Sequence, residues 1–184
     1  MNVILQTAIV SLIIQIIIAI IGLIGIQLPL SEKFIILREL LILETIVQMI
    51  ELTYYTWLIY NFTSIYYDVT FTRYFDWIIS TPIMIISTAV YMKYRTEKDA
   101  ITPLRLFPLF LENSSPIWNI LSFNWLMLLF GYLGEKKWVN RITGFIWGTI
   151  AFCISFFLLY IEFVGNDTIN HYLFWFMFIF WSLY

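Results

Sequence analysis

One stretch of sequence decides how this chain folds. It comprises residues 73–85 and reads Arg73-Tyr74-Phe75-Asp76-Trp77-Ile78-Ile79-Ser80-Thr81-Pro82-Ile83-Met84-Ile85. The stretch places a carboxylate, Asp76, inside an apolar segment that is long enough to cross a membrane. A buried ionised carboxylate is costly unless a cation or a hydrogen-bond network compensates it, so an acid at this depth is a functional hypothesis by default. The sequence therefore predicts a cation beside Asp76 within the membrane.

The composition indicates an integral membrane protein in a lipid bilayer. Hydrophobic residues make up 61% of the chain and charged residues only 12%, and the mean hydropathy is +0.86. The net charge of −2 gives no basic excess for nucleic acid, and the single cysteine, Cys153, excludes an internal disulfide. The sequence shows no nucleophile with a base and an orienting residue, no glycine-rich phosphate loop and no metal-ligand cluster, so nothing in it supports an enzyme.

The apolar runs predict six membrane-spanning helices in a single all-α domain over residues 1–184. The predicted spans are 3–27, 34–60, 70–92, 116–134, 138–163 and 168 to the end. Between the third and fourth spans, Pro103 and Pro108 interrupt an apolar segment, 101–115. A short helix in the headgroup region fits this segment better than a span, and an irregular loop is the alternative.

Positively charged residues give the expected orientation. With the amino terminus outside, six Lys and Arg residues fall on or near the inner side and four on the outer side, which favours an extracellular amino terminus. The last apolar run has no polar flank before Tyr184, so we expect the chain to stop within that helix.

Polar residues of the third predicted span share one face. Asp76, Ser80 and Ser87 lie four and eleven positions apart, and Arg73 precedes Asp76 by about one turn. This pattern indicates a pathway for protons or ions. The alternative is an Arg–Asp pair that only ties helices together.

The second span repeats the pattern with Glu44, Gln48 and Glu51 on one face. Two carboxylates at this depth can bind a passing cation or hold a proton, and packing gives no reason for them. On the first span, Ser11 and Gln15 also share a face. These two either line a wet cavity or form hydrogen bonds between helices.

Three motifs resemble those of the microbial rhodopsins. Arg73-Tyr74-x-Asp76-Trp77-x-x-Ser80-Thr81-Pro82 resembles their third helix, Phe130-Gly131-Tyr132-Leu133-Gly134-Glu135 the end of their fourth, and Trp181-Ser182-Leu183-Tyr184 the middle of their sixth. The resemblance covers the whole chain. It implies a seven-transmembrane-helix rhodopsin bundle, of which this chain covers helices one to most of six.

The resemblance also implies all-trans-retinal as cofactor, bound as a protonated Schiff base. Asp76 would be its counterion and proton acceptor, with Arg73 and Ser80 in the counterion network. The residues implied to wall the chromophore are Trp77, Thr81, Met84, Met127, Gly131, Trp181 and Tyr184. The family attaches retinal to a lysine on the seventh helix, whereas the five lysines here lie near membrane boundaries. We therefore expect the seventh helix to be absent from this sequence.

Within the family, the chain looks most like the viral group of light-gated cation channels. Proton pumps usually carry a carboxylic acid where this chain has Ser87, and a hydroxyl is a poor proton donor. The viral group has threonine at the position of Ser80. We expect a retinal photoreceptor that conducts cations past Ser11, Gln15, Glu44, Gln48, Glu51 and Ser87. An outward proton pump, a sensory rhodopsin and a retinal-free structural protein are the alternatives, and homo-oligomerisation is left open.

Overall fold

The computed structural model describes residues 3–65, 69–98 and 102–183, and these form helices joined by short links. The long helices are α1 (Val3–Gln27), α2 (Ile35–Tyr60), α4 (Val69–Glu97), α6 (Ser114–Glu135), α7 (Arg141–Leu159) and α8 (Thr168–Ser182). The short ones are the 3-10 turn η1 (Glu32–Phe34), α3 (Phe62–Ile65), α5 (Leu106–Glu112) and the π-helical turn η2 (Tyr160–Val164).

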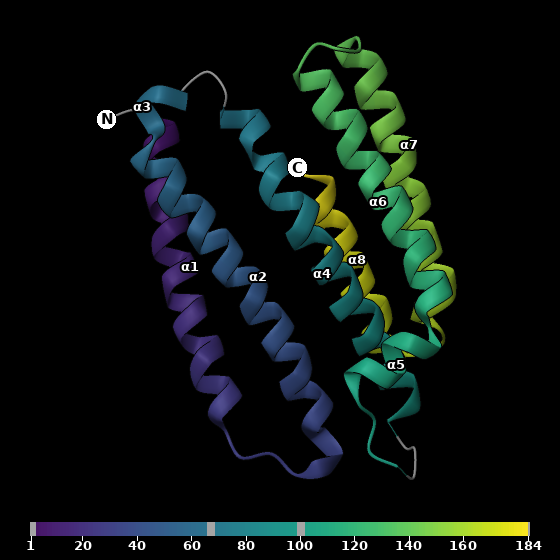
Figure 1. Cartoon of the computed structure of the whole chain (residues 1–184). Helices are drawn as coiled ribbons and strands as arrows, with labels where there is room; N and C mark the ends of the chain where they lie inside the picture. Colours follow the sequence, from purple (N-terminus) through teal and green to yellow (C-terminus); the bar gives the residue numbers. More distant parts are fainter. Residues whose placement is uncertain (1–2, 66–68, 99–101, 184) are drawn as a thin grey trace.

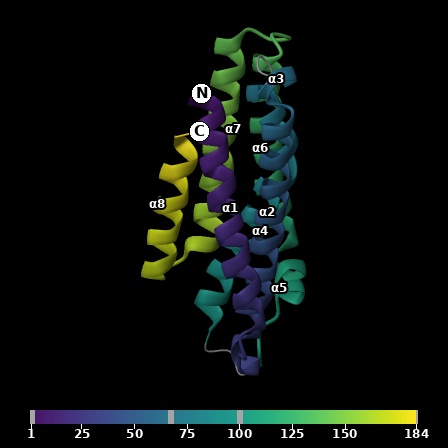
Figure 2. The ribbon, with the colours of Figure 1, turned by 90° about the vertical axis from the view of Figure 1, so that its left-hand side faces the viewer.

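The long helices run up and down in one bundle (Figure 1). One end of the bundle holds α3 and the α6–α7 link, and the opposite end holds α5 and the α1–α2 link. In Figure 2, α2, α4 and α6 form one layer on the right, α1 and α7 lie in the middle and α8 lies on the left. The most extensive packing is between α6 and α7, followed by α1 with α2, α2 with α4, and α4 with α6.

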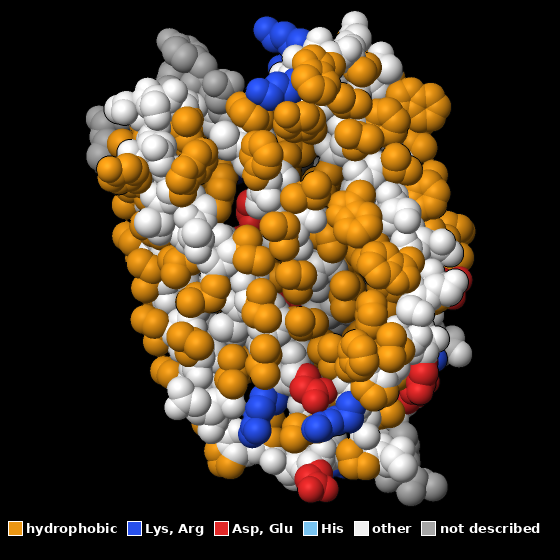
Figure 3. All heavy atoms as spheres, viewed as in Figure 1, with side chains coloured by type: hydrophobic (Ala, Val, Ile, Leu, Met, Phe, Trp, Pro, Cys, Tyr) orange, Lys and Arg blue, Asp and Glu red, His pale blue; other side chains and the backbone are white. Residues whose placement is uncertain are grey.

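Within the described part of the chain, four helices are long and apolar enough to cross a membrane, judged by length and composition: α1, α4, α6, and α7 together with η2. The other two predicted spans are helical as well, but α2 carries Glu44 and Glu51 near its middle and α8 has 15 residues. Hydrophobic side chains cover most of the face in Figure 3, and charged side chains gather mainly at its ends. This surface identifies a multi-pass membrane protein.

Two predictions about the link between the third and fourth spans have definite outcomes. The predicted end of the third span at residue 92 was wrong, because α4 continues to Glu97 and Lys93 pairs with Glu97 along it at 2.9 Å. A short helix does form within 101–115, as α5, and Pro108 is tolerated in its first turn, where no intrahelical donor is needed. Its place in the headgroup region stays a prediction.

The main hydrophobic core lies in the half of the bundle nearer α5. It joins α4 to α2, α5, α6, α7, η2 and α8 through Ile36, Leu40, Ile85, Ala89, Val90, Met92, Tyr94, Leu109, Ile117, Ile120, Leu121, Phe156, Leu159, Phe163, Val164, Phe174 and Met177. Helix α4 contributes the most members because half of its apolar window is buried, the highest share among the four candidate spans. The central position of α4 brings Asp76, Ser80 and Ser87 to the interior.

Candidate functional site

The polar face of α4 points into the bundle, as its spacing predicts. Asp76 is 7% exposed, Ser80 1% and Ser87 4%. The Ser80 hydroxyl donates to the backbone oxygen of Asp76 at 3.0 Å. The carboxylate atom Oδ1 of Asp76 is buried and has no hydrogen-bond partner among the residues that the structure describes. An acid in this position is a strong acceptor for a cation or a proton.

Arg73 lies one turn before Asp76 but does not pair directly with it. Its Nη2 donates to the hydroxyl of Tyr55 on α2 at 3.4 Å, and its guanidinium lies over the Trp77 ring, 6.0 Å from the centroid. Four ion pairs join residues within the described ranges, and none of them contains Arg73. The positive charge therefore acts on Asp76 through space and leaves its carboxylate accessible to another partner.

The predicted polar residues of α1, α2 and α4 meet in two pairs. The hydroxyl of Ser87 donates to Oε1 of Glu44, which joins α4 to α2. The amide of Gln15 donates to Oε2 of Glu51, which joins α1 to α2. Gln48 lies between the two glutamates on α2, and its Oε1 is buried without a partner in the described part of the chain. These contacts place a line of polar groups along the middle of α2.

The carboxylate of Glu51 is influenced by the other two carboxylates of this region. Both Asp76 and Glu44 contribute repulsive electrostatic interactions at Glu51. Like charges in a low-dielectric environment favour a cation or a bound proton among them. Ser11 lies one turn before Gln15 on α1 and is partly buried. Its role in the pathway stays a prediction.

The residues expected to wall a chromophore come from α4, α6 and α8. Trp77, Thr81, Met84, Met127 and Trp181 are all partly exposed. The Thr81 hydroxyl donates to the Trp77 carbonyl at 2.7 Å and accepts from Nδ2 of the buried Asn124 on α6 at 2.8 Å. Trp181 packs edge to face on Phe156 of α7, with ring centroids 5.5 Å apart. Tyr184 lies outside the described residues.

Gly131 on α6 leaves room for an aromatic side chain of this protein. A Cβ at Gly131 would come within 2.5 Å of the Tyr74 hydroxyl. Tyr74 also packs edge to face on Trp77, with ring centroids 5.3 Å apart. The missing side chain at Gly131 thus leaves room for the Tyr74 ring, and the contact of Gly131 with a chromophore ring stays a prediction.

A polar cluster where α8 begins was not predicted from the sequence. Nη2 of Arg95 on α4 pairs with Oδ2 of Asp167 at 3.1 Å. The fully buried Asn170 donates through Nδ2 to the carbonyls of Met92 at 3.0 Å and Val164 at 3.2 Å. Asp167 directly precedes the last predicted span and Asn170 lies in its first turn, and only their contact with α4 distinguishes them from ordinary capping residues.

Asp167 also caps α8. Its Oδ1 accepts from the backbone N–H groups of Ile169 and Asn170 at 2.9 and 3.1 Å. Desolvation opposes ionisation of this carboxyl, but the two backbone donors and Arg95 outweigh it and hold the pKa of Asp167 below its ordinary value. The Arg95–Asp167 pair and the helix cap therefore depend on the same carboxylate.

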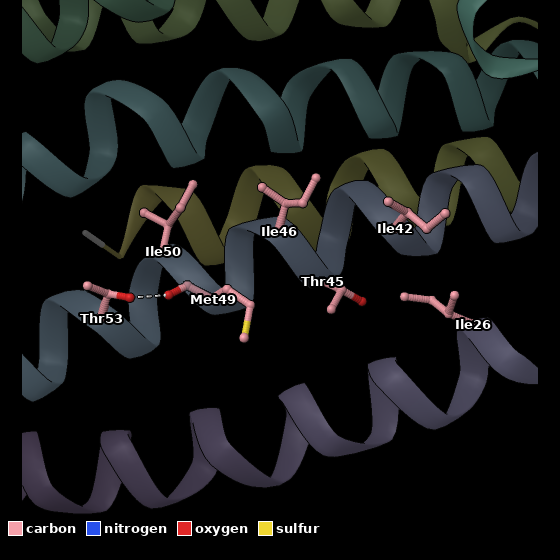
Figure 4. A pocket seen from close by; sticks show the side chains of 7 residues that line it. All are labelled: Ile26, Ile42, Thr45, Ile46, Met49, Ile50 and Thr53. Atoms are coloured by element: carbon pink, nitrogen blue, oxygen red, sulfur yellow. Dashed lines mark hydrogen bonds between the residues drawn. The ribbon is translucent and has the colours of Figure 1, made fainter.

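A shallow groove lies between α1 and α2, apart from the polar line. Its lining is mostly apolar, with Ile26 from α1 and six residues from α2, among them Met49 and Thr53 (Figure 4). The Thr53 hydroxyl donates back to the Met49 carbonyl at 2.8 Å. None of the predicted pathway residues lines this groove, so the polar line and the groove use different faces of α2.

Comparisons with known proteins agree with this architecture. The family model of bacteriorhodopsin-like proteins matches residues 6–184. The chain therefore belongs to the bacteriorhodopsin-like family. The crystal structure of the viral rhodopsin OLPVRII superposes with a TM-score of 0.83 at 23% sequence identity, over 99% of this chain and 81% of that one. This likeness shows a rhodopsin fold. A comparison with curated protein sequences found no match.

Proposed function

We propose that this protein is a retinal photoreceptor that works as a light-gated cation channel. The observation that carries the proposal is the line of polar side chains between α1, α2 and α4. The line contains the Gln15–Glu51 and Ser87–Glu44 hydrogen bonds and the Asp76 carboxylate. Charged and amide groups at this depth are characteristic of ion pathways. With the amino terminus outside, cations would enter from the end of the bundle that holds α3.

The residues present fit retinal. When bound, retinal would supply light absorption, a positive charge and a proton that can be transferred. The unpartnered Oδ1 of Asp76 is the acceptor that such a charge requires. Trp77 and Trp181 offer flat aromatic surfaces on α4 and α8, and Met84 and Met127 offer adaptable apolar ones. The five lysines of this sequence lie at helix ends or in links, so no attachment residue is assigned among them.

Each polar residue then has a distinct role. Asp76 takes up the proton, and Arg73 stabilises its charge from the side of Tyr55. Glu51 and Glu44 attract cations into the bundle because their carboxylates lie in a poorly solvated region. Gln15 and Ser87 each occupy one oxygen of these carboxylates, so a cation gains full access only when the two hydrogen bonds break.

A second candidate function is a light-driven outward proton pump. The observation that favours it is the contact between Ser87 and Glu44. Ser87 stands where family pumps have a carboxylic acid, and the structure brings the carboxyl of Glu44 onto that hydroxyl. A carboxylic acid held there could return a proton to the bundle, although the Ser87 hydroxyl alone could not.

Photocurrents in a voltage-clamped cell supplied with retinal test the proposal, measured on a protein that joins this chain to a helix with a retinal-attachment lysine. A passive channel gives a current that reverses sign at the cation equilibrium potential. A current that keeps its sign at every voltage excludes the channel, and light-driven acidification without a gradient then identifies the pump.

A variant at Glu51 tests the pathway itself. Glu51→Gln removes the charge but keeps the shape, so it should shift the reversal potential or lower the cation current. Glu112→Gln is the matched control, because Glu112 is an exposed residue on α5. If both variants conduct like the original protein, Glu51 does not lie on the pathway.

A further inference from the structure

Pro82 leaves one backbone carbonyl of α4 without its helical donor. A proline within a helix has no N–H, so the carbonyl four residues earlier, that of Ile78, loses its partner. Ile78 lies one residue after Trp77 and two after Asp76. In a membrane helix such a free carbonyl is costly unless a neighbouring group satisfies it.

A tryptophan on α6 provides the missing donor. Nε1 of Trp125 donates to the Ile78 carbonyl at 3.2 Å. The Trp125 side chain is 37% exposed and packs against Trp118, with ring centroids 6.2 Å apart. The indole thus replaces the N–H that Pro82 lacks, from a neighbouring helix.

The bond acts on the part of α4 that carries the candidate site. On α6, the neighbour of Trp125 is Asn124, which donates to Thr81 and thereby contacts the same turn of α4. One bond reaches a side chain and the other reaches the backbone, so together they fix both the height and the rotation of this turn. Trp77 and Asp76 lie on that turn or directly before it.

We infer that Trp125 is a positioning residue that sets the geometry of Trp77 and Asp76 through the carbonyl of Ile78. The inference rests on the proposed function only where it concerns retinal, because the hydrogen bond itself exists without a ligand. Trp125 would act from the lipid-facing side of α6, outside the set of residues implied to contact the chromophore.

A double-mutant cycle tests the bond without retinal. Trp125→Phe removes the N–H and keeps an aromatic ring, whereas Pro82→Ala restores a backbone N–H for Ile78. In detergent micelles, Trp125→Phe should lower the Tm by about 2–4 °C in the original sequence and by clearly less in the Pro82→Ala background. Equal losses in the two backgrounds, or no loss in either, would overturn the inference. Trp147→Phe is the control, since Trp147 is an exposed tryptophan on α7 that stacks on Phe130.

The absorption maximum of the retinal-loaded protein tests the positioning. Trp125→Phe should shift it, whereas Trp147→Phe should leave it unchanged, because a general loss of stability does not move a pigment band. An unshifted band in Trp125→Phe removes the positioning role. If a protein that joins this chain to a helix with a retinal-attachment lysine still forms no pigment, the proposed function fails. Positioning is then measured by amide hydrogen exchange in residues 76–81, which should be faster in Trp125→Phe than in Trp147→Phe, and equal rates reject it.

Discussion

The hydroxyl of Ser87 on α4 donates a hydrogen bond to Oε1 of Glu44 on α2. The same hydroxyl lies 3.0 Å from the carbonyl of Met84 on its own helix. A hydroxyl has a single hydrogen, so donation to Glu44 and donation to Met84 exclude each other at any moment. Ser87 can therefore hold or release the glutamate by a rotation of its side chain.

Replacement of Ser87 tests this switch. Ser87→Ala leaves a carboxylate oxygen of Glu44 without its donor, and loss of a hydrogen bond to a charged group costs about 1–3 kcal/mol where the group is buried. Under the proposed function, the channel of the variant should open more easily and close more slowly after light is switched off. Photocurrent decay measures this. Ser122→Ala is the control, because Ser122 is exposed and donates only to Trp118 of its own helix. Equal decay in the two variants would count against the switch.

Neutralisation of Asp76 tests the central charge. Asp76→Asn removes the negative charge beside the expected positive pigment, so the ground state loses stabilisation and the absorption maximum should move to longer wavelength. The photocurrent should fall at least tenfold, because an amide cannot take up the proton. Absorption spectra and photocurrents of the two proteins measure these effects. A pigment whose colour is indifferent to the change contradicts the counterion role.

Much of the fold follows from apolar run length alone. The boundaries of α1, α2 and α6 lie within two residues of the predicted ones, since each run ends in charged or turn-forming residues. The third span was predicted too short because Lys93, Arg95 and Glu97 were assigned to a link. On the helix, Lys93 and Glu97 stabilise each other one turn apart, and Arg95 finds Asp167. Charged residues therefore need not end a helix when they form ion pairs, as Lys93, Arg95 and Glu97 do.

The sequence predicted which residues of the candidate site share a helix face, but not which of them contact one another across helices. Helical periodicity places Glu44, Gln48 and Glu51 on one side of α2, and it places Ser87 with Asp76 on α4. It does not reveal that Ser87 meets Glu44, because helix rotation and height depend on packing across the whole bundle. The bond from Trp125 to Ile78 was missed for the same reason. Pro82 indicates that the carbonyl of Ile78 lacks its helical donor, but nothing in the sequence indicates which helix supplies another donor.

The charge pair at the start of α8 makes stability depend on pH. The pKa of Asp167 is below its ordinary value in the folded protein, so the carboxylate stabilises the fold above about pH 4 and loses this effect as the pH falls through the lowered pKa. Asp167→Asn should lower the Tm slightly at pH 7 and flatten its decline below about pH 4. Asparagine still accepts the backbone hydrogen bonds of the cap, so the variant isolates the charge.

Thermal unfolding between pH 3 and 7 in a detergent that is stable in acid measures this effect. Asp167→Ala, which removes the cap as well, should be less stable than Asp167→Asn at every pH. Glu112→Gln is the control on an exposed acid of α5. If Asp167→Asn follows the pH profile of the original protein, the Arg95–Asp167 pair does not contribute.

The close packing of α6 on α7 depends more on Gly144 than on Gly148, the glycine one turn later. A Cβ at Gly144 would come within 2.8 Å of the Phe130 carbonyl and 3.1 Å of Cα of Gly134, both of them backbone atoms that cannot move aside. At Gly148 the nearest atom, the carbonyl oxygen of Met127, would be 3.5 Å away, which is an ordinary contact. We therefore expect Gly144→Ala to force the helices apart and to cost about 1–3 kcal/mol, whereas Gly148→Ala should be tolerated. Unfolding of the two variants in the same detergent is the measurement, and equal stability of the two would contradict backbone contact between α6 and α7 at Gly144.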